Sequence, residues 1–329
     1  MINKKIKDFV KNKNKQKIIF TAGPGSLTKE NIMGLAPCFG RGDNLYKKTE
    51  NKVLSKLKKI SGHKNIVSMQ GSGSLALEIV ALNFLFGKVL IVSTGYYSDR
   101  LFDLSLKAKK TNKYIKYIKK INWQSINKIK EKFDWVWACP TETSRGLKLP
   151  IKDLKKLAKK ARAKLALDAT ASFGLENNHN LSDVTSFSSC KGLFGLTGAS
   201  FICYNSQPKN KINSFYLDLN SHKNKKMTGP YHAIQSLEFI LKDYNKFKKS
   251  VVMNKKKITR KFKNFLLYEK KNQPLLCTYL SCKIKPKLSK VILYKPRINL
   301  SGSVICHLGE AHLKGKSKGK IIDYLDIDD

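Results

Sequence analysis

A lysine and an aspartate lie at the ends of two apolar segments near the middle of this 329-residue chain. Lys191 follows the run 184–190, and Asp168 ends the run 164–168. If both runs are neighbouring strands, the two side chains meet. A lysine amine can form a Schiff base with an aldehyde, and a carboxylate can keep a pyridine nitrogen protonated, so the pair suits pyridoxal 5'-phosphate. The alternative is that Lys191 is one of many solvated lysines at strand ends.

The elements that must position this pair are indicated by the apolar pattern. Short β-branched runs alternate with helical stretches, which predicts an α/β fold with a mainly parallel, seven-stranded sheet. We expect strands at 66–69, 89–93, 114–118, 135–139, 164–168, 183–188 and 199–204, and helices at 74–86, 96–108, 123–132, 151–161 and 231–265. The expected organisation is a basic leader (1–17), a large cofactor-binding domain (18–249) and a small α+β C-terminal domain (250–329).

Three other segments follow predicted strand ends and could contact the same cofactor. The segment 70–74, QGSGS, precedes a predicted helix, where backbone N–H groups and the helix dipole bind phosphate; a dinucleotide site and an ordinary turn are the alternatives. Tyr97 could stack on a cofactor ring or pack in the core. The hydroxyl of Thr143 could bond the cofactor or cap a turn.

The composition is strongly basic, with 65 Lys and Arg against 23 Asp and Glu and a net charge of +42. Because only six of the 65 are arginines and the lysines are spread along the chain, we expect nonspecific attraction to polyanions and no specific nucleic-acid site. The seven cysteines form no zinc-type pattern, and we expect no metal site. No apolar segment has the length of a membrane span, which favours a cytoplasmic protein.

The order of these segments resembles the class V aminotransferases among the fold-type I pyridoxal-phosphate enzymes, and more narrowly the 2-aminoethylphosphonate–pyruvate transaminases. The resemblance extends from residue 20 to about 241. It rests on FTAGPG at 20–25, GSGSLALE at 71–78, DATASFG at 168–174, YLDL at 216–219 and TGP at 228–230.

The resemblance implies a homodimer with a cofactor site built from identified positions. Ser72, Gly73 and Ser74 would bind the phosphate, Tyr97 would stack on the ring, Thr143 would bond the cofactor, Asp168 would pair with the ring nitrogen, Lys191 would form the Schiff base, and Thr228 would reach the phosphate of the partner subunit.

Three positions depart from the family pattern. Cys190 replaces the usual Asn or Gln, Arg145 replaces a Thr, and Val304 stands where an arginine normally binds the substrate carboxylate. The substrate would then need another cation, for which Arg41, Arg145 and Arg297 are the candidates.

The sequence therefore predicts a pyridoxal-phosphate-dependent aminotransferase that moves an amino group from a small amino compound, with 2-aminoethylphosphonate as a candidate, to a 2-oxo acid such as pyruvate. The missing arginine keeps a lyase, decarboxylase or desulfurase open as an alternative, with Cys306 as the candidate thiol of a desulfurase. A catalytically degenerate relative that binds polyanions nonspecifically is the remaining alternative.

Overall fold

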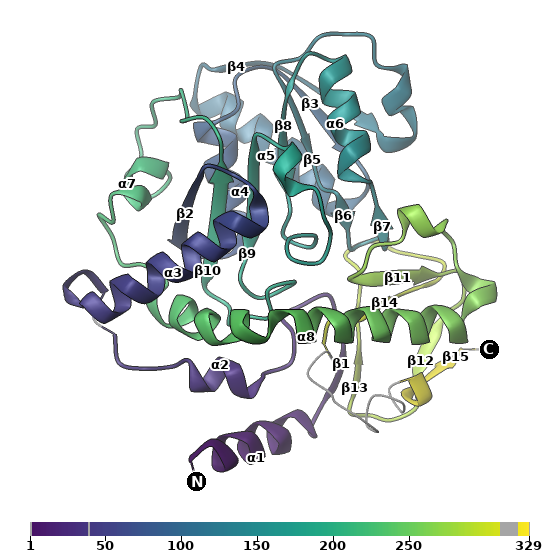
Figure 1. Ribbon diagram of the computed structural model, residues 1–329. Coiled ribbons are helices and arrows are strands. Elements are labelled where there is room, and N and C mark those ends of the chain that lie inside the picture. The colour runs from purple at the N-terminus through teal and green to yellow at the C-terminus, as the bar shows by residue number, and fades with distance from the viewer. Residues whose placement is uncertain (1, 39, 310–321, 329) are drawn as a thin grey trace.

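The computed structural model describes residues 2–38, 40–309 and 322–328, and its centre is a seven-stranded sheet (Figure 1). The strand order is β2-β10-β9-β8-β5-β3-β4, and all neighbouring pairs are parallel except the two that involve β10. The strands are β2 (Asn65–Gln70), β3 (Gly87–Ser93), β4 (Ile115–Asn122), β5 (Trp135–Ala138), β8 (Lys164–Asp168), β9 (Val184–Ser188) and β10 (Ala199–Tyr204). The predicted α/β class and the mainly parallel sheet of seven strands are confirmed.

Helices cover both faces of this sheet because successive strand residues point to opposite sides. In β5, Trp135 and Trp137 pack with α4 and α5, whereas Val136 and Ala138 pack with α6. The helices are α1 (Ile2–Asn14), α2 (Lys29–Met33), α3 (Asn44–Ser61), α4 (Gly73–Asn83), α5 (Tyr96–Thr111), α6 (Ile151–Lys160), α7 (Leu219–Lys223) and α8 (Tyr231–Lys261). Helices α3 and α8 bury their apolar sides against the region around β9 and β10.

Smaller two-stranded sheets lie near the far end of α8 (Figure 1). They pair β11 (Cys277–Leu280) with β14 (Ser303–Cys306), β12 (Ile284–Pro286) with β15 (Leu325–Ile327), and β1 (Ile18–Phe20) with β13 (Val291–Leu293). A further pair, β6 (Thr141–Glu142) and β7 (Leu147–Lys148), follows β5. The domain division stays a prediction: its boundary at residue 249 falls inside α8, and the proposed leader holds α1.

One predicted helix is wrong. Residues 123–132 contain only a 3-10 helix, Trp123–Lys128, which begins after the cap residue Asn122. Trp123, Ile126 and Ile129 recur every third residue and pack into one apolar cluster. A repeat of three matches the 3-10 helix better than the 3.6 residues per turn of an α-helix.

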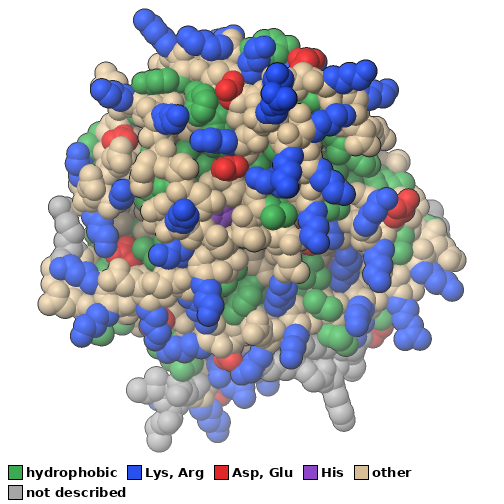
Figure 2. All heavy atoms as spheres, turned by 45° about the horizontal axis from the view of Figure 1, so that its top comes forward, with side chains coloured by type: hydrophobic (Ala, Val, Ile, Leu, Met, Phe, Trp, Pro, Cys, Tyr) green, Lys and Arg blue, Asp and Glu red, His purple; other side chains and the backbone are tan. Residues whose placement is uncertain are grey.

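On the face shown in Figure 2, Lys and Arg are scattered among apolar and neutral groups instead of gathering in one stripe. In the part of the chain that the structure describes, no helix combines the length and apolar character needed to cross a membrane.

Candidate active site

The carboxyl ends of β2, β3, β5, β8 and β9 meet at one edge of the sheet, as they must in parallel arrangement. A cavity of about 400 Å³ lies there, within the size range of small-ligand sites. Its lining includes seven of the residues predicted from the sequence: Ser72, Gly73, Ser74, Tyr97, Thr143, Asp168 and Lys191. Residues separated by more than a hundred positions in the chain thus surround one space.

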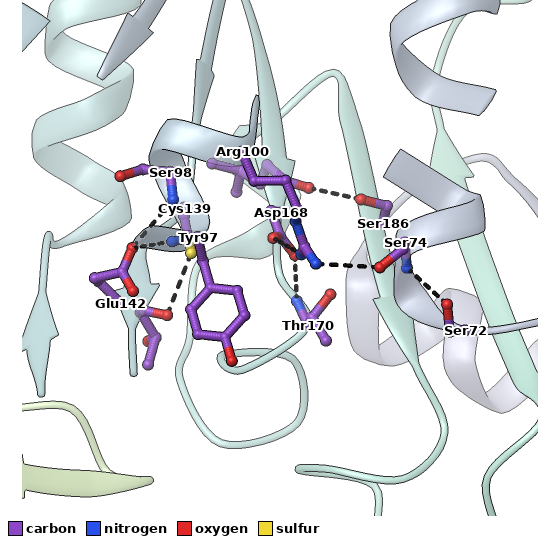
Figure 3. A network of polar contacts seen from close by, with 12 residues as sticks. Ser72, Ser74, Tyr97, Ser98, Arg100, Cys139, Glu142, Asp168, Thr170 and Ser186 are labelled. Carbon is purple, nitrogen blue, oxygen red and sulfur yellow. Dashed lines mark hydrogen bonds and ion pairs between the residues drawn. The ribbon is translucent and has the colours of Figure 1, made fainter. Parts of the chain in front are cut away.

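Asp168 lines this cavity, and its side chain is only 2% exposed. Its Oδ1 accepts a hydrogen bond from the backbone N–H of Thr170 at 3.0 Å. Its Oδ2 lies 3.7 Å from Nη2 of Arg100, which is an ion pair. Arg100 reaches across from α5 toward Asp168 and Ser74 (Figure 3). The sequence reasoning did not select Arg100.

Lys191 follows β9, and its Nζ lies 5.5 Å from the ring centroid of Tyr97. The turn at Gly23 packs directly on the stem of this lysine. A Cβ on Gly23, whose φ is +130°, would lie 2.9 Å from Cγ of Lys191, so a glycine is needed at this approach. The turn at Gly23 thus lies close to the side chain of Lys191, whose amine lies over the ring of Tyr97.

The first turn of α4 forms another wall of the cavity. Ser72 is the N-cap, and its hydroxyl accepts a hydrogen bond from the backbone N–H of Ser74 at 3.3 Å. A Cβ on Gly73 would lie 3.0 Å from Oγ1 of Thr170, so this glycine lets the helix start approach the segment after β8. Free N–H groups at a helix start are suited to bind an anion.

Glu142 of β6 fastens the start of α5, which carries Tyr97. Its carboxylate accepts hydrogen bonds from the backbone N–H groups of Tyr97 at 3.0 Å and Ser98 at 3.1 Å (Figure 3). It also accepts from the backbone and hydroxyl of Ser144, at 3.1 and 2.6 Å. Burial raises the pKa of Glu142, against the lowering effect of these bonds. No sequence signal marked it, because its partners lie on another element.

Several buried polar atoms around the cavity have no hydrogen-bond partner among the described residues. They are Oγ1 of Thr141, Thr143 and Thr170 and Nε of Arg100. Buried polar groups are normally paired, so this set indicates that a polar ligand belongs between them. A lysine, an aspartate, a helix start and free hydroxyls are the groups that pyridoxal phosphate requires, and the residues present therefore fit this cofactor.

The other predicted residues lie elsewhere. Thr228 is exposed and lines a separate cavity of about 120 Å³ beside Gln70, which lines both cavities. Arg145 is exposed near Tyr268. Val304 is buried in β14 opposite Tyr279, where it contributes to an apolar cluster. The side chain of Arg41 lies outside the described residues.

Arg297 lies beside the aromatic pair Tyr96 and Tyr97, of which Tyr97 lines the cavity. Its Cζ lies 5.6 Å from the ring centroid of Tyr96, whose ring meets that of Tyr97 edge-on. Interaction with Tyr96, and secondarily Tyr97, raises the pKa of Arg297. Tyr294, three residues earlier, lies beside Thr143 and Tyr97 without a hydrogen bond of normal geometry. Tyr294 was missed because no motif surrounds it in the sequence.

Cys306 does not have the setting expected of a desulfurase thiol. It is fully enclosed in β14, paired in register with Cys277 of β11, and burial raises its pKa well above the usual range. A mobile, ionised cysteine is not what this position provides.

The fold and this cavity define a pyridoxal-phosphate-dependent enzyme of the α/β class. Residues 42–228 match the family model for class-V aminotransferases. The chain belongs to the class V aminotransferase family, whose members use pyridoxal 5'-phosphate, which confirms the family, enzyme class and cofactor predicted from the sequence.

Solved structures share the fold at low identity, which confirms the fold-type I architecture. The alanine–glyoxylate aminotransferase from Nostoc sp. has a TM-score of 0.78 and 17% identity, with 94% of each chain covered. The pyridoxamine–pyruvate aminotransferase from Mesorhizobium loti has a TM-score of 0.74 and 18% identity, covering 90% of this chain and 87% of that one.

One curated relative carries more specific information. A bifunctional phosphonoacetaldehyde hydrolase/aminoethylphosphonate transaminase from Clostridioides difficile (strain 630) is 28% identical over 209 residues. The match covers 59% of this chain and 33% of the relative, so the matched part of this chain corresponds to about a third of that protein.

Proposed function

We propose that this protein is an aminotransferase that moves an amino group from a small amino compound to a 2-oxo acid, with 2-aminoethylphosphonate and pyruvate as the candidate pair. The observation that carries this proposal is the convergence of Lys191, Asp168 and the start of α4 on one cavity. The candidate donor is supported by the relative from Clostridioides difficile and by the family resemblance.

In this proposal each of these cavity residues has a separate role. Pyridoxal phosphate, when bound, supplies a ring that withdraws electrons from the carbon bearing the amino group. Asp168 keeps the ring nitrogen protonated, Tyr97 holds the ring face, and Thr143 bonds the cofactor. The amine of Lys191 takes the proton from the substrate carbon as a general base. The first turn of α4, from Ser72 to Ser74, binds the phosphate.

We further propose that Arg297 binds the anionic group of the substrate, because Val304 leaves no cation in β14. Arg297 is supported by its position over Tyr96, whose ring meets the cavity-lining Tyr97 edge-on. An arginine matches a carboxylate or phosphonate with paired hydrogen bonds. The sequence also predicts a homodimer in which Thr228 reaches the partner's phosphate. It predicts a cytoplasmic location as well, and both remain predictions.

The test is the visible absorbance of the purified protein loaded with pyridoxal phosphate. Addition of 2-aminoethylphosphonate should remove the band of the lysine-bound cofactor, and pyruvate should restore it. Lys191→Ala should lack the band from the start. Arg297→Met should keep the band but need roughly tenfold or more donor for the same conversion, since a charged hydrogen bond contributes about 1.5–3 kcal/mol.

The possible outcomes test the proposed donor separately from the proposed cofactor. A band that does not respond to this donor but responds to another small amine would reject the phosphonate and keep the aminotransferase. A band that decays without being restored by any 2-oxo acid would favour lyase or decarboxylase chemistry. If the wild-type protein forms no band, the proposed function is wrong.

A further inference from the structure

We propose that Arg100 binds the phosphate of the cofactor and is the main side-chain cation of that subsite. This inference rests on the cofactor of the proposed function and deepens it. The family resemblance assigns the phosphate to the first turn of α4 and gives Arg100 no role. The evidence for a role of Arg100 comes instead from the charge and geometry of the cavity.

The phosphate of the cofactor would add negative charge to the cavity, and a positive side chain is needed to balance it. Among the residues that the structure describes, only Arg100 and Lys191 bring a positive side chain to the cavity lining, and only Asp168 brings a negative one. A phosphate monoester adds a charge of about −1.5 to −2 at neutral pH. Lys191 would be engaged with the aldehyde of the cofactor, so Arg100 is the other cationic side chain of the described lining that could face the phosphate.

The guanidinium is already placed at the phosphate-binding helix start. Arg100 lies one turn after Tyr97 in α5, so both side chains share a helix face. Its Nη1 donates to Oγ of Ser74 at 3.1 Å, which holds it against the first turn of α4 (Figure 3). Its Cζ lies 5.2 Å from the ring centroid of Tyr97, on which it rests.

Among the described residues, Ser74 is the one hydrogen-bond acceptor of this guanidinium, so most of its donors could serve a ligand. An arginine has five N–H bonds, and the distance of 3.7 Å from Nη2 to Asp168 is too long for a hydrogen bond. The buried Nε has no partner among the described residues. The contact with Asp168 is therefore an ion pair without a hydrogen bond, which would leave Asp168 able to hold the ring nitrogen of the cofactor and Arg100 able to hold its phosphate.

The replacement at position 190 makes such a cation more necessary. Cys190 lines the cavity where the family usually has an amide side chain, and its Sγ is 3.8 Å from Oγ of Ser188. A thiol is a weak donor and contributes little to an anion. The forked, permanently charged guanidinium of Arg100 supplies what Cys190 lacks.

The test measures how tightly a phosphorylated ligand and its unphosphorylated form bind, both to the wild-type protein and to a variant that lacks the charge of Arg100. Pyridoxamine 5'-phosphate and pyridoxamine bind without a Schiff base, so calorimetry on the cofactor-free protein measures both directly. Arg100→Met removes the charge and keeps the length. We expect it to weaken pyridoxamine 5'-phosphate about 10- to 100-fold and pyridoxamine less than about threefold. Arg260→Met, at an exposed arginine of α8, should change neither affinity.

The pattern across the two ligands decides the role. Equal weakening of both would mean that Arg100 acts only through Asp168 or the local fold, and would overturn the proposal. Unchanged preference for the phosphorylated ligand would also overturn it. Arg100→Lys keeps a charge without the fork and should show an intermediate preference. If Arg100→Met does not fold, Arg100→Gln, which also removes the charge, takes its place in the same comparison.

These outcomes are distinct from failure of the proposed function. A wild-type protein that binds neither ligand and forms no visible band with pyridoxal phosphate would reject both. A wild-type protein that forms the band, loses it with Lys191→Ala and shows no role of Arg100 in phosphate preference would reject this inference alone.

Discussion

Replacing Glu142 by glutamine should destabilise the protein by a predictable amount, because this buried carboxylate has four hydrogen-bond donors around it. Glutamine keeps one acceptor oxygen and turns the other into an NH2 donor. The favoured orientation keeps the oxygen toward the N–H groups of Tyr97 and Ser98. The NH2 then faces Ser144, whose hydroxyl can turn to accept but whose backbone N–H cannot.

One buried N–H is therefore left unpaired, at a cost of about 1–3 kcal/mol in the free energy of unfolding. Alanine at Glu142 would remove the acceptor for three backbone N–H groups, those of Tyr97, Ser98 and Ser144, and should cost about 3–9 kcal/mol. The hydrogen-bond geometry therefore predicts that Glu142→Ala lowers the free energy of unfolding more than Glu142→Gln does.

The assay is urea unfolding of the cofactor-free protein, followed by tryptophan fluorescence. Glu269→Gln is the matched control, because Glu269 is exposed and its ion pair with Lys271 lies on the surface; it should change the free energy of unfolding by less than about 0.5 kcal/mol. If Glu142→Gln and Glu142→Ala cost the same, or if both match the control, Glu142 does not fasten α5 as described.

Two further predictions concern acid stability and the helix start. Burial lowers the pKa of His179 and of His307 to about 3, so both stay neutral in the folded protein while unfolded histidine titrates near 6.5. The unfolded state then binds more protons between these values, and stability should fall by about 1.4 kcal/mol per histidine for each pH unit below about 6.5. His179→Gln should remove one such contribution from the slope of urea midpoints against pH, and an unchanged slope would contradict a neutral His179 in the folded protein. Gly73→Ala would put a Cβ 3.0 Å from Oγ1 of Thr170. Cofactor affinity, measured by titration of the absorbance band, should drop about tenfold while the urea midpoint barely moves. A lower urea midpoint with unchanged cofactor affinity would show that the new Cβ strains the fold and not the site.

The central sheet was predictable because its signals are local. The strands β8 and β10 have the predicted bounds, 164–168 and 199–204, since each is a continuous apolar run enclosed on both faces. The loop 70–74 was predictable because its glycines and serines stand between a strand and a helix. Parallel strands then bring their carboxyl ends together, so the order of motifs in the chain became a set of neighbours around one cavity.

The parts that were missed depend on contacts between distant segments. Tyr294 approaches Thr143 from a segment after β13, and its sequence surroundings carry no motif. Glu142 acts by accepting bonds from another helix. Arg100 had a local signal, one helical turn after Tyr97, but its pairing with Asp168 requires knowledge of which strands are adjacent.

The length of α8 gives the molecule a mechanical property. At 1.5 Å per residue its 31 residues span about 46 Å, from the neighbourhood of the central sheet to that of β11 and β14. A tilt of about 5° at one end of such a rod would shift the other by about 4 Å. Because α8 packs beside β9 and β10 at one part and contacts β11 at another, a single continuous helix fixes the spacing between the central sheet and the small β11–β14 sheet.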